Sequence, residues 1–171
     1  THSHVVKDVC VGCHMQPVAS GDPAFTKAGG HTFSMTYTSG TNVIDKVDVC
    51  QSCHGPVEEF NFARKDYDGD GVIQGVQTEV QNLLNQLSRL LPSSAYKANS
   101  NDYVADGLIK SPSAKTNWPV RFLQAAWNWQ FVNVEGSHGV HNASYAVGLL
   151  KASIADLTDD ADNDGISDKW E

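Results

Sequence analysis

The feature that most constrains this chain is a motif that occurs twice and contains every cysteine. The two copies read DVCVGCH and DVCQSCH, at residues 8–14 and 48–54. In each copy a Cys-x-x-Cys pair is followed at once by histidine, which is the signature of c-type haem attachment. The two thiols bond to the porphyrin, and the histidine binds the iron as the proximal ligand. We therefore expect two c-type haems, one on Cys10, Cys13 and His14 and the other on Cys50, Cys53 and His54.

Other uses of paired cysteines explain this motif less completely. A zinc site of four cysteines would use two Cys-x-x-Cys pairs, but it would not require a histidine after each pair. A thioredoxin-like redox pair needs a βαβ context, which this sequence lacks. Disulfides would leave the repeated histidine unexplained. Because bacteria attach c-type haem outside the cytoplasm, we expect an exported protein that is periplasmic, cell-surface or extracellular.

The size and composition are those of a globular protein. The chain has 171 residues, of which 40% are hydrophobic and 19% charged, enough for one domain with a sizeable core. No apolar run approaches the ~18 residues that a spanning helix needs, so we expect no membrane span. No basic stripe indicates nucleic-acid binding. The chain begins at Thr1 without methionine, so we expect that a signal was removed or that this is a piece of a longer protein.

Each haem iron needs a sixth ligand or keeps an open position. After the two proximal histidines, five of the seven histidines remain as candidates. His31 lies in AGGHTF, a loop that could fold over a porphyrin, although it could also be an ordinary surface residue. Methionine also binds haem iron, but Met15 directly follows His14 and Met35 is a weaker candidate than His31. The remaining candidates are His2, His4, His138 and His141.

These four histidines form two pairs. His138 and His141 lie in GSHGVHN, ahead of a segment with helical periodicity for which Asn142 is a plausible N-cap. His2 and His4 precede the first haem motif. They belong either to a mobile terminus or to a haem site, in this chain or in a neighbouring subunit. The second alternative would allow self-assembly into a haem-linked polymer.

The order CVGCHM, GGHTF, CQSCH and GVHN resembles the C-terminal haem region of multihaem cytochromes, the lineage of cytochrome c nitrite reductase and hydroxylamine oxidoreductase. The resemblance implies that His31 and His141 are distal ligands and that the haems are bis-histidine. The sequence departs from this lineage in having only two haem motifs and no lysine-containing attachment motif. These departures argue against an enzymatic activity.

The net charge of −8 is local, because two short segments hold ten of the twenty acidic residues. Such clusters suggest cation sites. The last twelve residues, DADNDGISDKWE, match a calcium loop position by position. Its ligands would be Asp160, Asp162, Asp164, Ile166 through its carbonyl, Asp168 and Glu171.

A second acidic segment, DYDGDGVIQGVQTE, is less complete. Its twelfth position is Gln77, and Glu79 comes two residues later. The segment is either a second calcium site or a solvated acidic turn that caps the following helix. The ligands of the site would be Asp66, Asp68, Asp70, the Val72 carbonyl and Glu79. We expect one or two structural calcium ions.

The sequence predicts a mainly α fold that is loop-rich, with about three helices packed around two haems. The predicted helices cover residues 76–91 before Pro92, residues 119–132, and the segment after Asn142. Residues 1–60 and 92–118 are predicted to be loops, and no strand pattern persists. The middle helix is predicted to bury Phe122, Leu123, Ala126, Trp129 and Phe131. We expect a dihaem domain over 1–158, including the acidic loop 66–79, and a calcium loop over 159–171.

The expected function is electron transfer, in anaerobic or extracellular respiration. An iron with histidine on both faces has no position for a substrate, so it changes oxidation state without changing ligands. Its partners would be redox proteins or a terminal electron acceptor. The alternative is a fragment or subunit of a multihaem reductase in which one haem is open.

Overall fold

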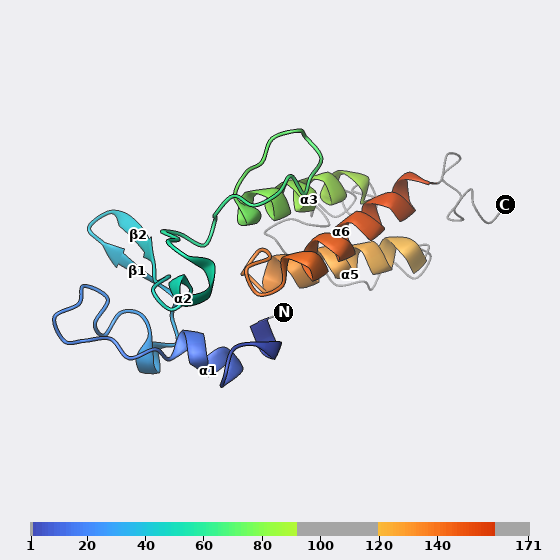
Figure 1. Ribbon diagram of the computed structural model, residues 1–171. Helices are drawn as coiled ribbons and strands as arrows, with labels where there is room; N and C mark the ends of the chain where they lie inside the picture. Colours follow the sequence, from blue (N-terminus) through green and yellow to red (C-terminus); the bar gives the residue numbers. More distant parts are fainter. Residues whose placement is uncertain (1, 92–119, 160–171) are drawn as a thin grey trace. The chain divides into compact units, whose positions relative to one another are not determined.

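The computed structural model describes residues 2–91 and 120–159 (Figure 1). The chain divides into two compact units, Thr1–Arg64 and Lys65–Glu171. This boundary falls inside the range 1–158 that the sequence analysis assigned to one haem domain. The predicted C-terminal calcium loop, with all its ligands from Asp160 to Glu171, lies outside the described residues.

The first unit consists of short elements joined by irregular segments, as the sequence predicted. Both haem motifs are helical: the first forms α1 and the second forms the single turn of α2. Two 3₁₀ turns contain histidines that are candidate ligands. In chain order the elements are η1 (His2–His4), α1 (Val9–His14), η2 (Gly30–Thr32), β1 (Thr36–Ser39), β2 (Asn42–Asp45) and α2 (Gln51–His54).

Strands β1 and β2 form an antiparallel hairpin, with Thr36 opposite Asp45 and Ser39 opposite Asn42. The expectation of no strands was therefore wrong at this place. Gly40 begins the two-residue turn with φ 62°, a conformation that hairpin turns of this length need and that glycine adopts without strain. Most residues of both strands are exposed, so the sequence lacks the alternation of a half-buried strand that would have revealed them.

The first unit buries very little apolar surface. Among its described residues, the buried apolar side chains are only those of Ala24, Ala28 and Val47. Seven larger apolar side chains are exposed instead: Val5, Val9, Val11, Phe25, Phe33, Val43 and Ile44. A unit of about 60 residues is marginally stable even with a normal core. This unit therefore lacks the apolar packing that would hold it together by itself.

The second unit contains a bundle of three helices, each packed against the other two: α3 (Val76–Leu90), α5 (Val120–Val134) and α6 (Ala143–Thr158) (Figure 1). The buried face of α3 recurs at helical spacing through Val80, Leu83, Leu84 and Leu87. These residues pack with Trp129 and with Leu150 of α6 in one core. The three predicted helices are confirmed, the middle one over Val120–Val134.

The N-cap of α6 is also confirmed, because the Asn142 side chain accepts a hydrogen bond from the Tyr145 N–H at 3.2 Å. The predicted buried face of α5 was correct for Phe122, Ala126 and Trp129. It was wrong for Leu123 and Phe131, which are 38% and 46% exposed. The sequence is apolar around much of this helix, so periodicity alone did not identify the side that packs.

The described part of the chain is mainly helical. None of its helices combines the length and the apolar character that crossing a membrane requires.

Candidate functional site

Helix α1 places the three chemically active residues of the first haem motif within a little more than one turn. Cys10, Cys13 and His14 follow at intervals of three and one, so the two sulfurs and the imidazole project from neighbouring positions of the helix. In the second motif, Cys50 is the N-cap of α2, which then carries Cys53 and His54. Gly55, with φ 76°, ends this turn. None of the four thiols is in a disulfide.

The thiols of the two motifs influence one another. The pKa of Cys13 is raised by burial first, and then by the negative charge that Cys10 and Cys53 would carry as thiolates. The pKa of Cys50 is raised by burial and by the charges of Cys13, Asp48 and Cys53. The two attachment motifs therefore lie near each other within the first unit.

This proximity does not make a zinc site of the cysteines. In the described ranges 2–91 and 120–159, only one group of three or more histidine, cysteine or acidic side chains has its ligand atoms within 4.8 Å of one another, and it is acidic. Tetrahedral zinc with sulfur bonds of ~2.3 Å needs sulfurs within about 4 Å of each other.

His14, predicted to be the first proximal ligand, is oriented by the segment that follows η2. Its Nδ1 lies 2.8 Å from the carbonyl oxygen of Phe33. A carbonyl can only accept, so Nδ1 carries the hydrogen and the lone pair of the neutral imidazole is on Nε2. The Phe33 ring also stacks on the imidazole, with centroids 4.3 Å apart and planes at 12°. Metal-binding histidines are commonly oriented by such hydrogen bonds.

Phe33 makes these contacts from an unfavourable backbone conformation, with φ 58°. A bulky residue in the left-handed region costs on the order of 1–3 kcal/mol and tends to occur at functional sites. Nothing in the sequence relates Phe33 to a histidine nineteen positions earlier, so its role could not be predicted from the sequence. His31, two residues before it, is exposed on η2.

His54, predicted to be the second proximal ligand, lies near two aromatic rings of the same unit. Its ring centroid is 5.7 Å from that of Phe62 and 5.8 Å from that of His2. The structure therefore places His2, one of the N-terminal candidates for a distal ligand, beside His54. His4 is exposed on the same 3₁₀ turn.

The GSHGVHN loop in the second unit is held by a network centred on Glu135. Its carboxylate lies 3.2 Å from Nδ1 of His141 and accepts a hydrogen bond of 2.8 Å from the Ser137 hydroxyl. Ser137 Oγ also accepts from the His141 N–H at 3.3 Å. His138 takes φ 47° within this turn. Glu135 is a second residue that sequence reasoning missed, and its contact with His141 is typical of a carboxylate that orients a metal-binding imidazole.

The next residue of this loop, Gly139, is required by packing. Its φ is 94°, and a Cβ placed there would lie 3.1 Å from a methyl group of Val80 in α3. The loop therefore approaches α3 closely and begins α6 from a defined position. That His138 or His141 binds iron stays a prediction.

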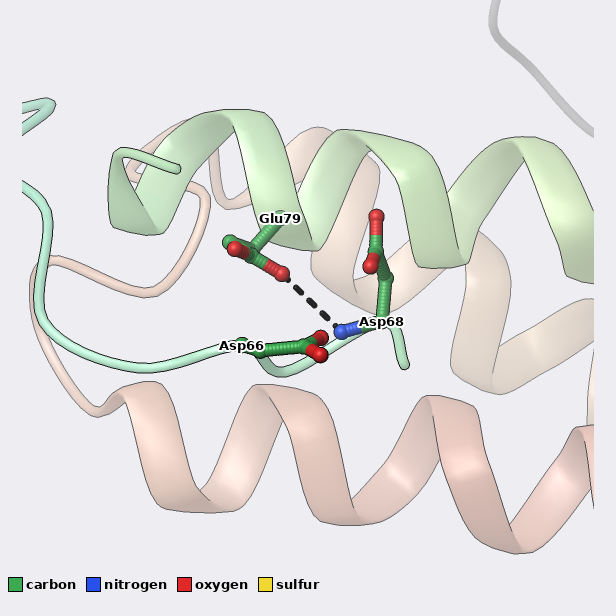
Figure 2. Close-up of side chains that lie close together, drawn as sticks. All are labelled: Asp66, Asp68 and Glu79. Atoms are coloured by element: carbon green, nitrogen blue, oxygen red, sulfur yellow. Dashed lines mark hydrogen bonds between the residues drawn. The ribbon is translucent and has the colours of Figure 1, made fainter. Parts of the chain in front are cut away.

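The acidic segment before α3 folds as a tight loop with its carboxylates turned inward. Ligand atoms of Asp66, Asp68 and Glu79 lie within 4.8 Å of one another. Figure 2 shows the two aspartates on the loop and Glu79 reaching toward them from α3. Asp70 is not in this group, and Val72 is 54% exposed. The structure thus joins three of the four predicted acidic ligands.

Glu79 is the central residue of this loop, and it is completely buried. One carboxylate oxygen accepts hydrogen bonds from the N–H groups of Tyr67 and Asp68, at 2.8 and 3.0 Å. The other oxygen accepts from the Gln74 N–H at 2.8 Å. Glu79 therefore closes the loop onto the helix, although it stands two positions later than a calcium loop requires. Three convergent carboxylates form a hard-oxygen donor set that suits calcium.

Comparison with known proteins gave no match: no family model, no curated protein and no solved structure is significantly similar to this chain.

Proposed function

We propose that this chain is an electron-transferring cytochrome with two c-type haems attached in its first unit. The observation that carries the proposal is the scarcity of buried apolar side chains in the unit that holds both Cys-x-x-Cys-His motifs. A unit of about 60 residues that buries so little apolar surface needs another source of stability, which small natural domains often obtain from disulfides or a metal, and these cysteines form no disulfide. Two covalently held porphyrins would supply the missing apolar partner for the exposed side chains.

The chain contains enough histidines for both irons to be bound on two faces. When bound, the haems would supply reversible one-electron iron chemistry. The chain's own residues would attach the ring edges through cysteine and hold the imidazoles in one orientation. Phe33 does this for His14, through a carbonyl 2.8 Å from Nδ1. Irons ligated on both faces exchange electrons without binding substrate, so the proposal includes a redox partner protein or an external acceptor, and no catalytic residue.

The resemblance to the nitrite reductase and hydroxylamine oxidoreductase lineage belongs to this proposal, with His31 and His141 as distal ligands. Bis-histidine ligation favours lower potentials than histidine–methionine ligation, which suits anaerobic or extracellular respiration by an exported protein. The acidic loop of Asp66, Asp68 and Glu79 is proposed to bind calcium as a structural ion that ties the loop to α3.

The test is expression of the chain in a host that matures c-type cytochromes. We expect two haems per chain that remain bound after denaturation, measured by intact mass and by the pyridine haemochrome spectrum. Low-spin ferric signals from both haems that cyanide and nitrite do not alter are expected for an electron carrier. A high-spin component that shifts when either ligand is added would instead indicate an open haem. The matched control is Cys50→Ala/Cys53→Ala, which should retain one haem.

A further inference from the structure

The contact between His2 and His54 carries an inference about the second haem. We propose that His2 is the distal axial ligand of the iron whose proximal ligand is His54. The inference rests on the proposed attachment of haem to Cys50 and Cys53. It would complete the second site with residues of the first unit alone.

The separation of the two rings fits ligation of one iron from opposite sides. Nitrogen–metal bonds in proteins are ~2.0–2.1 Å long, so two imidazoles that share a metal have ring centroids about 6 Å apart. The centroids of His2 and His54 lie 5.8 Å apart. Direct stacking gives a shorter separation, as the 4.3 Å between His14 and Phe33 shows. The planes of the two histidines lie at 64° to each other, so the rings meet edge-on and are not stacked.

The backbone around His2 is held in place. The His2 carbonyl accepts hydrogen bonds from the N–H groups of Val5 and Val6, at 3.0 and 2.8 Å. These bonds form the turn η1, which leads into the helix of the first haem motif. His2 therefore reaches His54 from an ordered turn, which argues against the alternative of a mobile terminus.

The contact also separates His2 from His4. His4 lies on the same turn, yet within the described part of the chain no ring contact joins it to a proximal histidine. A mobile histidine pair would present both rings alike, whereas this turn directs one of them to His54. His4 is therefore the matched control for any substitution of His2.

This assignment changes the distribution of ligands between the two irons. With His2 on the second haem only one distal position remains, so His2 would replace one of the two distal ligands that the resemblance implies, His31 or His141. It also makes the N-terminal ligand intramolecular, so a haem-linked polymer would have to use another histidine. Loss of His2 should accordingly affect one haem and leave the other unchanged.

The experiment compares His2→Ala and His4→Ala in the haem-loaded chain by electron paramagnetic resonance and visible spectroscopy of the ferric state. We expect His2→Ala to convert one of the two haems from low spin to high spin, and added imidazole to restore the low-spin signal. His4→Ala should match the unsubstituted chain. His2→Met should keep that haem six-coordinate and raise its potential.

The haem that changes is identified in the variant Cys50→Ala/Cys53→Ala, which retains only the first haem. There His2→Ala should have no spectral effect. The inference is overturned if His2→Ala leaves both haems low-spin, or if the first haem is the one that changes. A chain that matures without covalent haem would contradict the proposed function itself, and mass measurement distinguishes that result from failure of the ligand assignment.

Discussion

The carboxylate of Glu135 lies 3.2 Å from Nδ1 of His141, across the turn that leads into α6. The histidine side chain is 63% exposed and that of the glutamate 25%. The carboxylate of Glu135 also accepts a hydrogen bond from the Ser137 hydroxyl at 2.8 Å, so contacts within the turn hold it in this position. A carboxylate at Nδ1 fixes the imidazole ring and makes its other nitrogen a stronger donor to a metal.

From this contact we predict that, if His141 is a haem ligand as proposed, Glu135→Gln raises the potential of that haem. The neutral amide stabilises the oxidised iron less. A partly exposed charge pair contributes ~0.5–1 kcal/mol, which corresponds to roughly 20–40 mV for a one-electron couple. The measurement is a spectroelectrochemical titration of both haems. The control is Asp156→Asn, which removes one exposed carboxylate near the other end of α6. It should leave both haem potentials within a few millivolts of the original values. Equal shifts of potential in the two variants would contradict the prediction.

Glu79→Gln should destabilise the second unit and remove the part of its calcium response that comes from the loop of Asp66, Asp68 and Glu79. The buried carboxylate accepts three backbone hydrogen bonds, and an amide has only one oxygen to accept them, so we expect a loss of ~2–3 kcal/mol. Thermal unfolding with calcium and with a chelator measures both effects. Glu58→Gln, at an exposed position of the first unit, is the control and should keep the calcium response. A chelator that leaves the melting temperature of the unsubstituted chain unchanged would exclude a stabilising ion.

Two tryptophans of α5 allow a matched test of the helical bundle. The indole N–H of Trp129 donates to the Leu84 carbonyl at 2.9 Å in the core, whereas Trp127 is 69% exposed. Trp129→Phe should cost ~1–3 kcal/mol, because it removes that bond and leaves a small cavity. Trp127→Phe should change the free energy of unfolding by less than ~0.5 kcal/mol. Chemical denaturation of the two variants compares these values, and similar losses would be inconsistent with the packing described.

The two units should respond differently when haem is not attached. Only three small apolar residues are buried in the described part of the first unit. In a chain produced without haem, the backbone amides of this unit should therefore exchange their hydrogens rapidly with solvent. Peptides from α3 and α6 should remain protected, because their core contains no part of a haem motif. Hydrogen exchange with mass spectrometry, on loaded and unloaded chains, measures both. Strong protection of residues 2–64 without haem would contradict the proposed role of the porphyrins.

The local features of this protein follow from its sequence by itself. The spacing of cysteine and histidine defines the two Cys-x-x-Cys-His motifs, and a residue pattern with a period of 3.6 predicts α3, α5 and α6. The residue type at position 142 predicts the N-cap of α6. These features depend on residues a few positions apart, so their physical cause is contained in a short segment. The hairpin at residues 36–45 escaped prediction because its side chains are mostly exposed, which removes the apolar alternation that marks a strand.

The relationships that position the candidate ligands were decided only by the tertiary structure. The ring of His2 contacts that of His54, and the Phe33 carbonyl is hydrogen-bonded to His14. The segments between these residues are irregular, and no local sequence pattern predicts their path. The sequence placed Glu79 near the acidic loop, but its complete burial and its three backbone donors depend on the path of the loop against α3. Local propensity depends on neighbours in the chain, whereas these contacts depend on where the folded backbone brings distant segments together.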